Sequence, residues 1–331
     1  MPRPSSPDVL PYRHVASVDP KPPEAQWLVQ SLWAAKGVGL IGALPKSLKT
    51  WLACELAIAV ASGKEALGRF SVKDHGPVLF YAAEDDLPSM RVRLQAIAET
   101  RQVVLKNTPV YLIDLPVLRL DDEEQFCRLR QTVAAVRPRL LILDPFVRCV
   151  NIDENSAQEV SAVLGSLRAL QREGDVAIAV VHHMRKSRSV NLGQQLRGSG
   201  DFAAWTDSGL YLTRHGPDLV LFVEHRGAPA PAPMRIRLDP QPAPHLVVEP
   251  EACPLSAAGS SADNLRDAVL ARLRSASRSL PTVKLRDQLK VRKAKLLEVL
   301  HELRANGVVQ HTAQGWALAE GQLPLTYDED V

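Results

Sequence analysis

Short apolar runs alternate with amphipathic stretches from Trp33 to about Glu249, and this alternation predicts the main elements of the chain. Five runs are predicted to be buried strands, and the stretches between them carry apolar residues at helical spacing. Strands that are almost continuously apolar are typical of a parallel sheet covered by helices on both faces. The predicted strands span 38–43, 77–84, 109–115, 139–144 and 176–183, and the predicted helices span 49–63, 87–100, 121–136 and 156–173.

The pattern changes after the fifth predicted strand. Four further runs alternate apolar and polar residues, and short turns rich in Gly and Pro join them. Such spacing predicts antiparallel strands that extend the sheet, with the helices ending at this point. These runs span 208–214, 219–225, 234–239 and 244–250.

The two ends of the chain differ from this central α/β core, which we place at residues 31–249. Residues 1–30 are rich in proline and lack periodicity, so they predict an extended arm. The Pro/Ala/Ser/Gly-rich residues 250–262 predict a linker. Three helical stretches and two short strands over 263–319 follow the order of a winged-helix domain, and 320–331 predict an acidic tail.

Composition narrows the class of protein. Hydrophobic residues make up 46% and charged residues 23% of the chain, as in ordinary soluble domains. No run approaches the roughly 18 apolar residues that cross a bilayer, and the first residues lack the apolar core of a secretion signal. The four cysteines are scattered without a Cys-x-x-Cys pair, which argues against a zinc site or a disulfide framework. We therefore expect a cytoplasmic protein without a membrane partner.

The formal net charge of +3 is unevenly distributed. Residues 261–316 contain eleven Lys and Arg against five Asp and Glu, a local charge of +6, so the remainder sums to −3. This asymmetry favours a polyanion partner for the C-terminal region. Its third predicted helix carries Arg292, Lys293 and Lys295 at the start, where a recognition helix contacts DNA. A protein-contact surface and a merely solvated basic face remain the alternatives.

The segment GALPKSLKTW, at 42–51, has the end of a phosphate-binding loop without its glycines. In the pattern G-x-x-x-x-G-K-[ST], Lys49 and Thr50 occupy the last two positions, while Ala43 and Leu48 replace the glycines. Backbone N–H groups at such a strand-to-helix turn bind phosphate together with the lysine. The alternative is a lysine that opens an ordinary amphipathic helix. The predicted nucleotide-binding residues are Ala43, Leu44, Pro45, Lys46, Ser47, Leu48, Lys49, Thr50 and Trp51.

Leu48 is the more demanding of the two replacements. Glycine has no Cβ, so at this position it avoids a clash with the phosphate and permits unusual dihedral angles. Leucine still supplies an N–H donor, and it is compatible with phosphate binding if the loop keeps negative φ values. Ala43 adds only a methyl group.

Three of the predicted parallel strands end in residues that suit phosphate chemistry. Glu84, Asp144 and the pair His182-His183 stand at the carboxyl ends of the second, fourth and fifth strands. Because the carboxyl ends of parallel strands meet at one edge of a sheet, these side chains are expected to gather there. Each residue alone could be a helix cap or a loop charge. Together they predict a site in which Asp144 organises magnesium and the histidine pair senses a γ-phosphate or positions a neighbouring strand.

Four segments resemble the RecA-type ATPases related to the plasmid replicative helicase RepA and the DnaB helicases. They are GALPKSLKTWLA, VLFYAAEDD, LLILDPFVR and AIAVVHHMRKS, and the resemblance spans roughly residues 33–240. It implies a RecA-like fold that binds ATP and Mg²⁺ between the subunits of a homo-oligomeric ring, for which a hexamer is one candidate. It also implies single-stranded DNA inside the ring. Duplex DNA is the partner that the winged helix is expected to bind, because of its own basic residues.

The resemblance also implies a role for individual residues. Lys49 corresponds to the phosphate-binding lysine, and Thr50 and Asp144 to the magnesium-organising pair. Glu84 corresponds to the catalytic glutamate that orients the attacking water, and His183 to the sensor. Arg226 is the candidate arginine finger that reaches a neighbouring subunit, although a surface arginine in a turn is an equal alternative. Arg197 would face DNA or a neighbouring subunit.

These features predict an ATP-dependent DNA-associated motor or helicase of the RepA type. A second hypothesis is a nucleotide-responsive DNA-binding switch, in which the altered loop binds ATP with weak or no hydrolysis. A third is a structural assembly factor whose nucleotide site is empty. Strand separation coupled to turnover would fit only the first.

Overall fold

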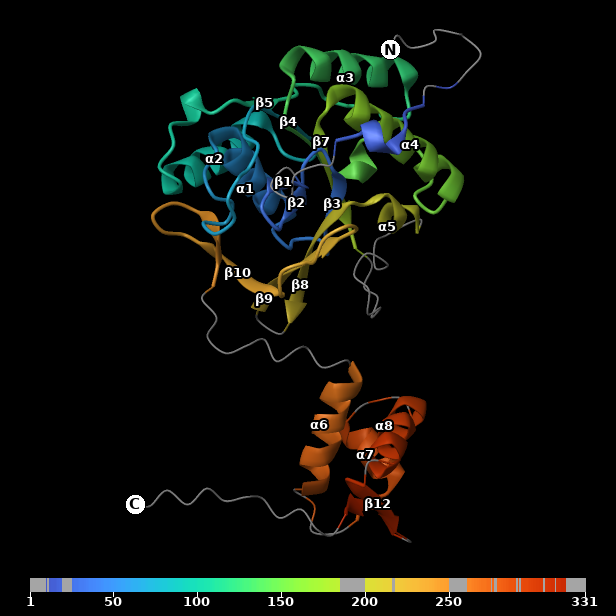
Figure 1. Cartoon of the computed structure of the whole chain (residues 1–331). Coiled ribbons are helices and arrows are strands. Elements are labelled where there is room, and N and C mark those ends of the chain that lie inside the picture. Colours follow the sequence, from blue (N-terminus) through green and yellow to red (C-terminus); the bar gives the residue numbers. More distant parts are fainter. Residues whose placement is uncertain are drawn as a thin grey trace. The chain divides into compact units, whose positions relative to one another are not determined.

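The computed structural model divides into two compact units, Met1–Pro250 and Glu251–Val331. The first contains the sheet with its helices, and the second is a small helical bundle with a hairpin (Figure 1). The residues that the structure describes are 10, 12–19, 26–184, 200–215, 218–249, 261–274, 276, 279–289, 291, 293–305, 307–312 and 314–319.

A nine-stranded sheet forms the centre of the first unit, in the order β11-β10-β9-β8-β3-β7-β6-β4-β5. The five strands from β3 to β5 in this order pair in parallel, which confirms the predicted parallel sheet. Their near-continuous apolar sequence follows from burial on both faces. They are β3 (Val38–Ala43), β4 (Val78–Ala82), β5 (Val110–Leu112), β6 (Leu140–Asp144) and β7 (Ala177–His183).

Helices cover both faces of these parallel strands, as predicted (Figure 1). Alternate strand residues belong to separate cores, so that Ile41 packs with α1 and α2, and Leu40 packs with α3 and α4. Helix α1 is buried almost all round, which explains why it lacks a polar face. The helices are α1 (Lys49–Ser62), α2 (Leu87–Thr100), α3 (Glu123–Val136) and α4 (Ala157–Gly174).

Local sequence explains where these helices begin and end. The side chains of Asp86, Asp122 and Ser156 accept backbone N–H bonds at the starts of α2, α3 and α4. Gly63 ends α1 in the left-handed conformation, with φ of 74°, as predicted from its position. Short 3-10 helices lie at Val15–Ser17, Leu105–Asn107 and Phe146–Arg148.

Four later strands extend the sheet beyond β3: β8 (Ser208–His215), β9 (Asp218–His225), β10 (Met234–Asp239) and β11 (His245–Val248). They pair antiparallel with one another, as predicted. The first of them, β8, nevertheless runs parallel to β3, which the alternating pattern did not reveal. Helix α5 (Asp201–Trp205) precedes β8, and its five residues are too short to show helical periodicity in the sequence.

The structure also differs from the prediction at the end of the predicted N-terminal arm. Strands β1 (Trp27–Val29) and β2 (Trp33–Ala34) form a hairpin, although residues 27–29 were assigned to the arm. The apolar residues Leu28, Val29 and Trp33 are almost fully buried in the core shared with α1. Hydrophobic burial therefore holds this segment, although it is too short to show periodicity.

The second unit has the predicted order of three helices and a hairpin. Its elements are α6 (Ser261–Arg274), α7 (Thr282–Leu289), α8 (Lys293–Ala305), β12 (Val309–Thr312) and β13 (Gly315–Leu318), so α6 begins two residues earlier than the predicted domain. Trp316 packs back on the helices, and its Nε1 donates to Thr282 Oγ1 at 3.1 Å. Its backbone exchanges two hydrogen bonds with Leu280, which joins the hairpin to the segment before α7. Among the described helices of the chain, none is long and apolar enough to span a membrane.

Candidate nucleotide-binding site

The predicted phosphate-binding loop lies between the carboxyl end of β3 and the start of α1. Ala43, the last residue of β3, lies opposite His183 of β7 and Leu212 of β8, so the loop leaves the sheet between two other strands. Lys49 is the first residue of α1. The first helical N–H groups, which lack partners within a helix, therefore lie at this turn and can bind an anion.

Lys49 is largely buried, with 8% of its surface exposed. Its Nζ donates to the carbonyl oxygen of Leu44 at 3.2 Å, which closes the loop over the ammonium group. Burial lowers the pKa of Lys49, while the nearby carboxylates of Asp144 and Glu84 oppose that change. A desolvated cation at a helix start interacts strongly with a phosphate, because little solvent screens the pair.

Thr50 and Asp144 form the second part of the site. The Thr50 hydroxyl donates to Asp144 Oδ2 at 2.7 Å, although the two residues are far apart in the sequence. Burial raises the pKa of Asp144 to about 6, whereas the Thr50 hydrogen bond and the charge of Lys49 oppose the rise. A hydroxyl and a carboxylate supply the oxygen ligands that Mg²⁺ prefers, so this pair fits the ion. A bound dication would favour the ionised form of Asp144.

The three acidic residues after β4 have different partners. Glu84 pairs with Arg148, with 2.9 Å between Oε1 and Nε, and both side chains are exposed. Asp85 pairs with Arg93, with Oδ1 and Nη2 2.9 Å apart. Asp86 caps α2, so the alternative that an acid after this strand is a helix cap holds for Asp86. Sequence reasoning missed Arg148 as the partner of Glu84, although this arginine lies in the LLILDPFVR segment.

Glu84 also lies beside the Thr50–Asp144 pair. Strands β4 and β6 are neighbours, with Ala82 opposite Asp144. The Ala83 backbone N–H donates to the Asp144 carbonyl at 2.7 Å, which places the end of β4 against the end of β6. The structure thus brings Glu84, Asp144, Lys49 and Thr50 to one edge of the sheet.

The adjacent histidines at the end of β7 face opposite sides of the sheet. His182 is fully buried and stacks on Phe202, with ring centroids 4.3 Å apart. His183 lies on the α1 side, opposite Ala43 in the register. Strand alternation therefore places His183 beside the loop and assigns His182 to the core on the other face.

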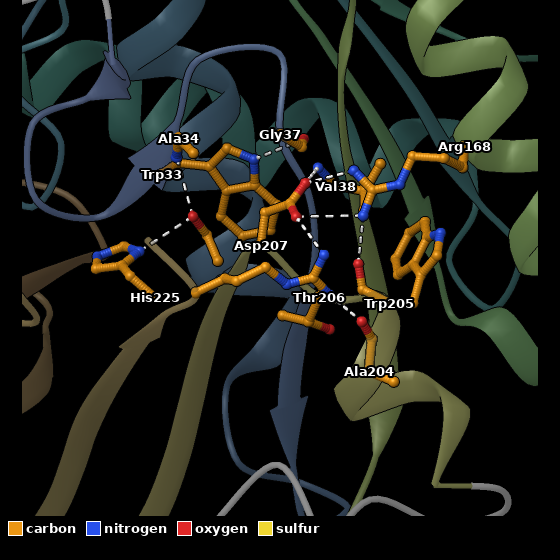
Figure 2. Close-up of polar contacts among 12 residues, drawn as sticks. Trp33, Ala34, Gly37, Val38, Arg168, Ala204, Trp205, Thr206, Asp207 and His225 are labelled. Carbon is orange, nitrogen blue, oxygen red and sulfur yellow. Dashed lines mark hydrogen bonds and ion pairs between the residues drawn. The ribbon is translucent and has the colours of Figure 1, made fainter. Parts of the chain in front are cut away.

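Arg226 lies at the opposite edge of the sheet from the loop. Its Nη1 is 3.3 Å from Asp207 Oδ1, and its guanidinium also donates to the Ala204 carbonyl. Asp207 accepts from the N–H of Val38, the first residue of β3, at 3.1 Å and pairs with Arg168 on α4 (Figure 2). Since the loop follows the last residue of β3, Arg226 cannot act on the phosphates bound by its own chain.

The predicted DNA-binding residues are less fully described. Arg197 and Arg292 lie outside the described residues, as does the side chain of Lys295. Lys293 is exposed at the start of α8.

The loop departs from the expected dihedral angles. Leu48 has φ of 61° and ψ of 24°, and Lys46 has φ of 60°, so neither residue meets the condition of negative φ values under which a leucine is readily accommodated. The left-handed conformation costs an L-residue about 1–2 kcal/mol. Packing of the half-buried Leu48 side chain against the α1 core offsets part of this cost. The chain therefore keeps at Leu48 a backbone conformation that favours glycine.

Leu48→Gly is expected to be more stable than Leu48→Ala by about 0.5–1 kcal/mol, because only glycine adopts positive φ without strain. Both variants lose the same side-chain packing, so the difference isolates the backbone. Urea unfolding of the two proteins measures it. Ala134→Gly, at an exposed position of α3, is the control and should lose about 1 kcal/mol. Greater stability of Leu48→Ala than of Leu48→Gly would contradict the left-handed conformation.

Comparison with protein families supports the assignment of this edge of the sheet. A family model described as an AAA domain matches residues 4–189, more than half of the 331 residues. The chain belongs to the AAA domain family. The matched part of the AAA domain includes the loop, Glu84, Asp144 and His183, whereas Arg226 and the second unit lie beyond it. Family membership and the geometry of the loop identify an ATPase-type nucleotide-binding domain.

Comparison with curated proteins finds no match. Among solved structures, the fold is similar to a RadB recombinase (18% identity, TM-score 0.46, covering 62% of this chain and 88% of that chain). A second solved structure, an ATPase domain, has 15% identity and a TM-score of 0.47, covering 62% of this chain and 83% of that one. The KaiC-like protein PH0186 from Pyrococcus horikoshii OT3 has 15% identity and a TM-score of 0.45, covering 67% and 94%.

Proposed function

We propose that this AAA domain protein is an ATP-dependent, DNA-associated motor or helicase of the RepA type. The observation that carries the proposal is the buried Lys49 at the start of α1, beside the Thr50–Asp144 hydrogen bond. Residues from three neighbouring segments can bind phosphate, hold magnesium and supply a catalytic carboxylate there. ATP with Mg²⁺ is the proposed ligand.

Each residue of this site has a distinct proposed task. Lys49 neutralises the charge of the terminal phosphates, and Thr50 and Asp144 hold magnesium, which itself supplies charge neutralisation when bound. Glu84 orients the attacking water once its carboxylate leaves Arg148, and His183 responds to the γ-phosphate. The Glu84–Arg148 pair is solvent-exposed and therefore contributes only about 0–1 kcal/mol, so this exchange is inexpensive.

Arg226 is proposed to act on the nucleotide of a neighbouring subunit in a ring-forming homo-oligomer, with a hexamer as one candidate. Its position at the far edge of its own sheet excludes action in cis, so a catalytic role would require action in trans. The Arg226 side chain is 51% exposed, so it can exchange Asp207 for a phosphate across a subunit interface. Arg197 is proposed to face DNA or the neighbouring subunit.

The second unit is proposed to be a winged-helix domain that binds duplex DNA, joined to the core by a linker over residues 250–262. Its three helices and hairpin have the required order, and its sequence has a local surplus of positive charge. The start of α8, with Arg292, Lys293 and Lys295, would contact DNA. Binding of this kind weakens as salt concentration rises.

Leu48 favours the nucleotide-responsive switch as a second candidate function. The site then binds ATP, but a strained leucine beside the phosphate slows hydrolysis. In this alternative, ATP changes assembly and the second unit binds DNA.

Glu84→Gln is expected to retain ATP binding and to lose at least about 100-fold in turnover, because only the carboxylate can accept the proton of the attacking water. Turnover is measured by phosphate release with and without single-stranded DNA, and binding by calorimetry. Glu99→Gln removes an exposed carboxylate from α2 and is the matched control with wild-type turnover expected.

The outcomes separate the two candidates. DNA-stimulated turnover that Glu84→Gln abolishes supports the motor. ATP binding by the wild type without turnover supports the switch. Absence of ATP binding by the wild type would contradict both.

A further inference from the structure

Helix α5 packs on the α4 side of the sheet, and its two ends contact groups at opposite edges. Phe202, near its start, stacks on His182, the residue before the proposed sensor His183, with ring centroids 4.3 Å apart. Near the other end of α5, the carbonyl of Ala204 accepts from the guanidinium of Arg226. One short helix therefore links the neighbour of the γ-phosphate sensor to the arginine that is proposed to act in trans.

The contact at the start of α5 is a buried cluster of three rings. Phe202, His182 and Phe146 are all fully buried. Phe146 lies in the 3-10 helix after β6, and its ring meets that of Phe202 edge-to-face with centroids 5.2 Å apart. Rings packed at interior density cannot move independently of one another. A displacement at the end of β7 is therefore transmitted to α5.

Two arginines hold the other end of α5 with unequal strength. Arg168 of α4 donates to the Trp205 carbonyl and pairs with Asp207 (Figure 2). The Arg226 side chain is 51% exposed, compared with 22% for Arg168, and it reaches Asp207 only at 3.3 Å. When Arg226 leaves, Asp207 keeps both Arg168 and the N–H of Val38. Arg226 is therefore the exchangeable partner, because its departure leaves no carboxylate unpaired.

The order of α5 depends on the contacts at its two ends. The helix has five residues, fewer than the roughly 12–15 that make an isolated helix stable in water. Gly200, at the N-cap position, has no side chain to cap it. The N–H of Ala204 lies 3.4 Å from the Gly200 carbonyl, which is long for a hydrogen bond. Release of one end is therefore enough to loosen the helix, and order–disorder changes of this kind are a common form of switch.

We propose that α5 is a latch that couples the γ-phosphate sensor of each subunit to the Arg226 of the same subunit. The proposal rests on the proposed function and adds the regulation of its trans-acting arginine. While the ring stack with His182 is intact, α5 presents the Ala204 carbonyl and retains Arg226. The response of His183 to a γ-phosphate displaces the adjacent His182, loosens α5 and frees Arg226. A subunit thus acts on its neighbour only after it has bound ATP itself.

Trp205 reports on the latch because it is the last residue of α5 and is 8% exposed. Fluorine NMR of protein labelled with fluorotryptophan should show one resonance for each of the five tryptophans, and Trp205→Phe identifies the one from α5. A non-hydrolysable ATP analogue with Mg²⁺ should shift that resonance in the wild type, whereas Mg–ADP, which lacks the γ-phosphate, should not.

Phe202→Leu removes the ring stack and keeps an apolar side chain. It should abolish the shift caused by the analogue and should bind the analogue at least as tightly as the wild type does, because a loosened latch no longer opposes binding. Damage to the fold would weaken binding instead. Phe126→Leu makes the same change in the same core, on α3, and should respond as the wild type does.

Turnover provides a second measurement. Phe202→Leu should raise phosphate release at low ATP concentration by about 2–5-fold, the most that release of an exposed ion pair allows. The same substitution should have no effect on turnover in an Arg226→Ala background, because the latch acts only through that arginine.

Two results would overturn the latch. One is an unchanged Trp205 resonance in a wild type that binds the analogue, which needs no substitution in the core and leaves the proposed function standing. The other is an equal effect of Phe202→Leu on turnover with and without Arg226. If the wild type binds neither nucleotide, the proposed function fails first, and the latch fails with it.

Discussion

Lys49→Ala is expected to weaken binding of Mg–ATP by about 100-fold or more, because a hydrogen bond to a charged group is worth about 1.5–3 kcal/mol and burial strengthens it. Lys49 is 8% exposed in the fold, and its ammonium group lies within the field of Asp144 and Glu84. Its removal leaves the negative charge of those two carboxylates less compensated where the phosphates bind, although Glu84 keeps its pairing with Arg148. Calorimetric titration of the purified protein with ATP and magnesium measures the effect.

Lys64→Ala is the control for this experiment. Lys64 follows the far end of α1, about 22 Å away by the rise of a helix, and it is exposed. The control variant changes the net charge equally but should bind ATP with wild-type affinity. Equal affinities for all three proteins would show that the loop does not bind phosphate.

Glu55→Ala is expected to lower the free energy of unfolding by about 3–5 kcal/mol, the usual cost of breaking a buried ion pair. Glu55 lies on α1 with 1% of its side chain exposed, and its Oε2 is 2.9 Å from Arg101 Nη2. Its other oxygen accepts the N–H of Leu246, on edge strand β11, at 2.8 Å. Removal would leave a buried N–H without its acceptor and the Arg101 guanidinium with only the Leu246 carbonyl, which it contacts at 3.2 Å, and no carboxylate. Urea unfolding at neutral pH measures the loss.

Two further variants separate charge from packing at this position. Burial raises the pKa of Glu55, and Arg101 opposes that rise. Glu55→Gln keeps an acceptor for Leu246 and should cost less than Glu55→Ala. The double variant Glu55→Leu/Arg101→Met removes both charges together and should be closer to the wild type than Glu55→Ala. A loss below about 1 kcal/mol in Glu55→Ala would contradict the structural role of the pair.

The loop shows how far sequence reasoning extends at the site. The Lys-Thr dipeptide placed the start of α1 correctly, because a strand, a turn and a helix have distinct local patterns. The dihedral angles of Leu48 were not predictable, since the surrounding core allows a side chain where glycine is expected. Local propensity favours negative φ for leucine, and tertiary packing overrides it.

The ionic partners of Glu84 and Arg226 likewise could not be predicted from the sequence. Glu84 was identified from its place at a strand end, but its pairing with Arg148 joins segments after two different strands. Arg226 was identified from its place after a late strand, and its contacts with Asp207 and Ala204 place it at the other edge of the sheet. Which edge a turn occupies depends on the direction of each strand, and β8 proved to be parallel to β3.

By itself, the sequence determined the α/β class, the boundaries of α1 to α4 to within two residues, and the gathering of Lys49, Asp144 and Glu84 at one edge. Periodicity and the constant direction of parallel strands are enough for these conclusions, because both are local or topological properties. Only the tertiary structure decided the strained conformation of Leu48, the side of the sheet that each histidine faces, and the contacts at the two ends of α5. These depend on how residues distant in sequence pack together, and such contacts leave no periodic signal in the chain.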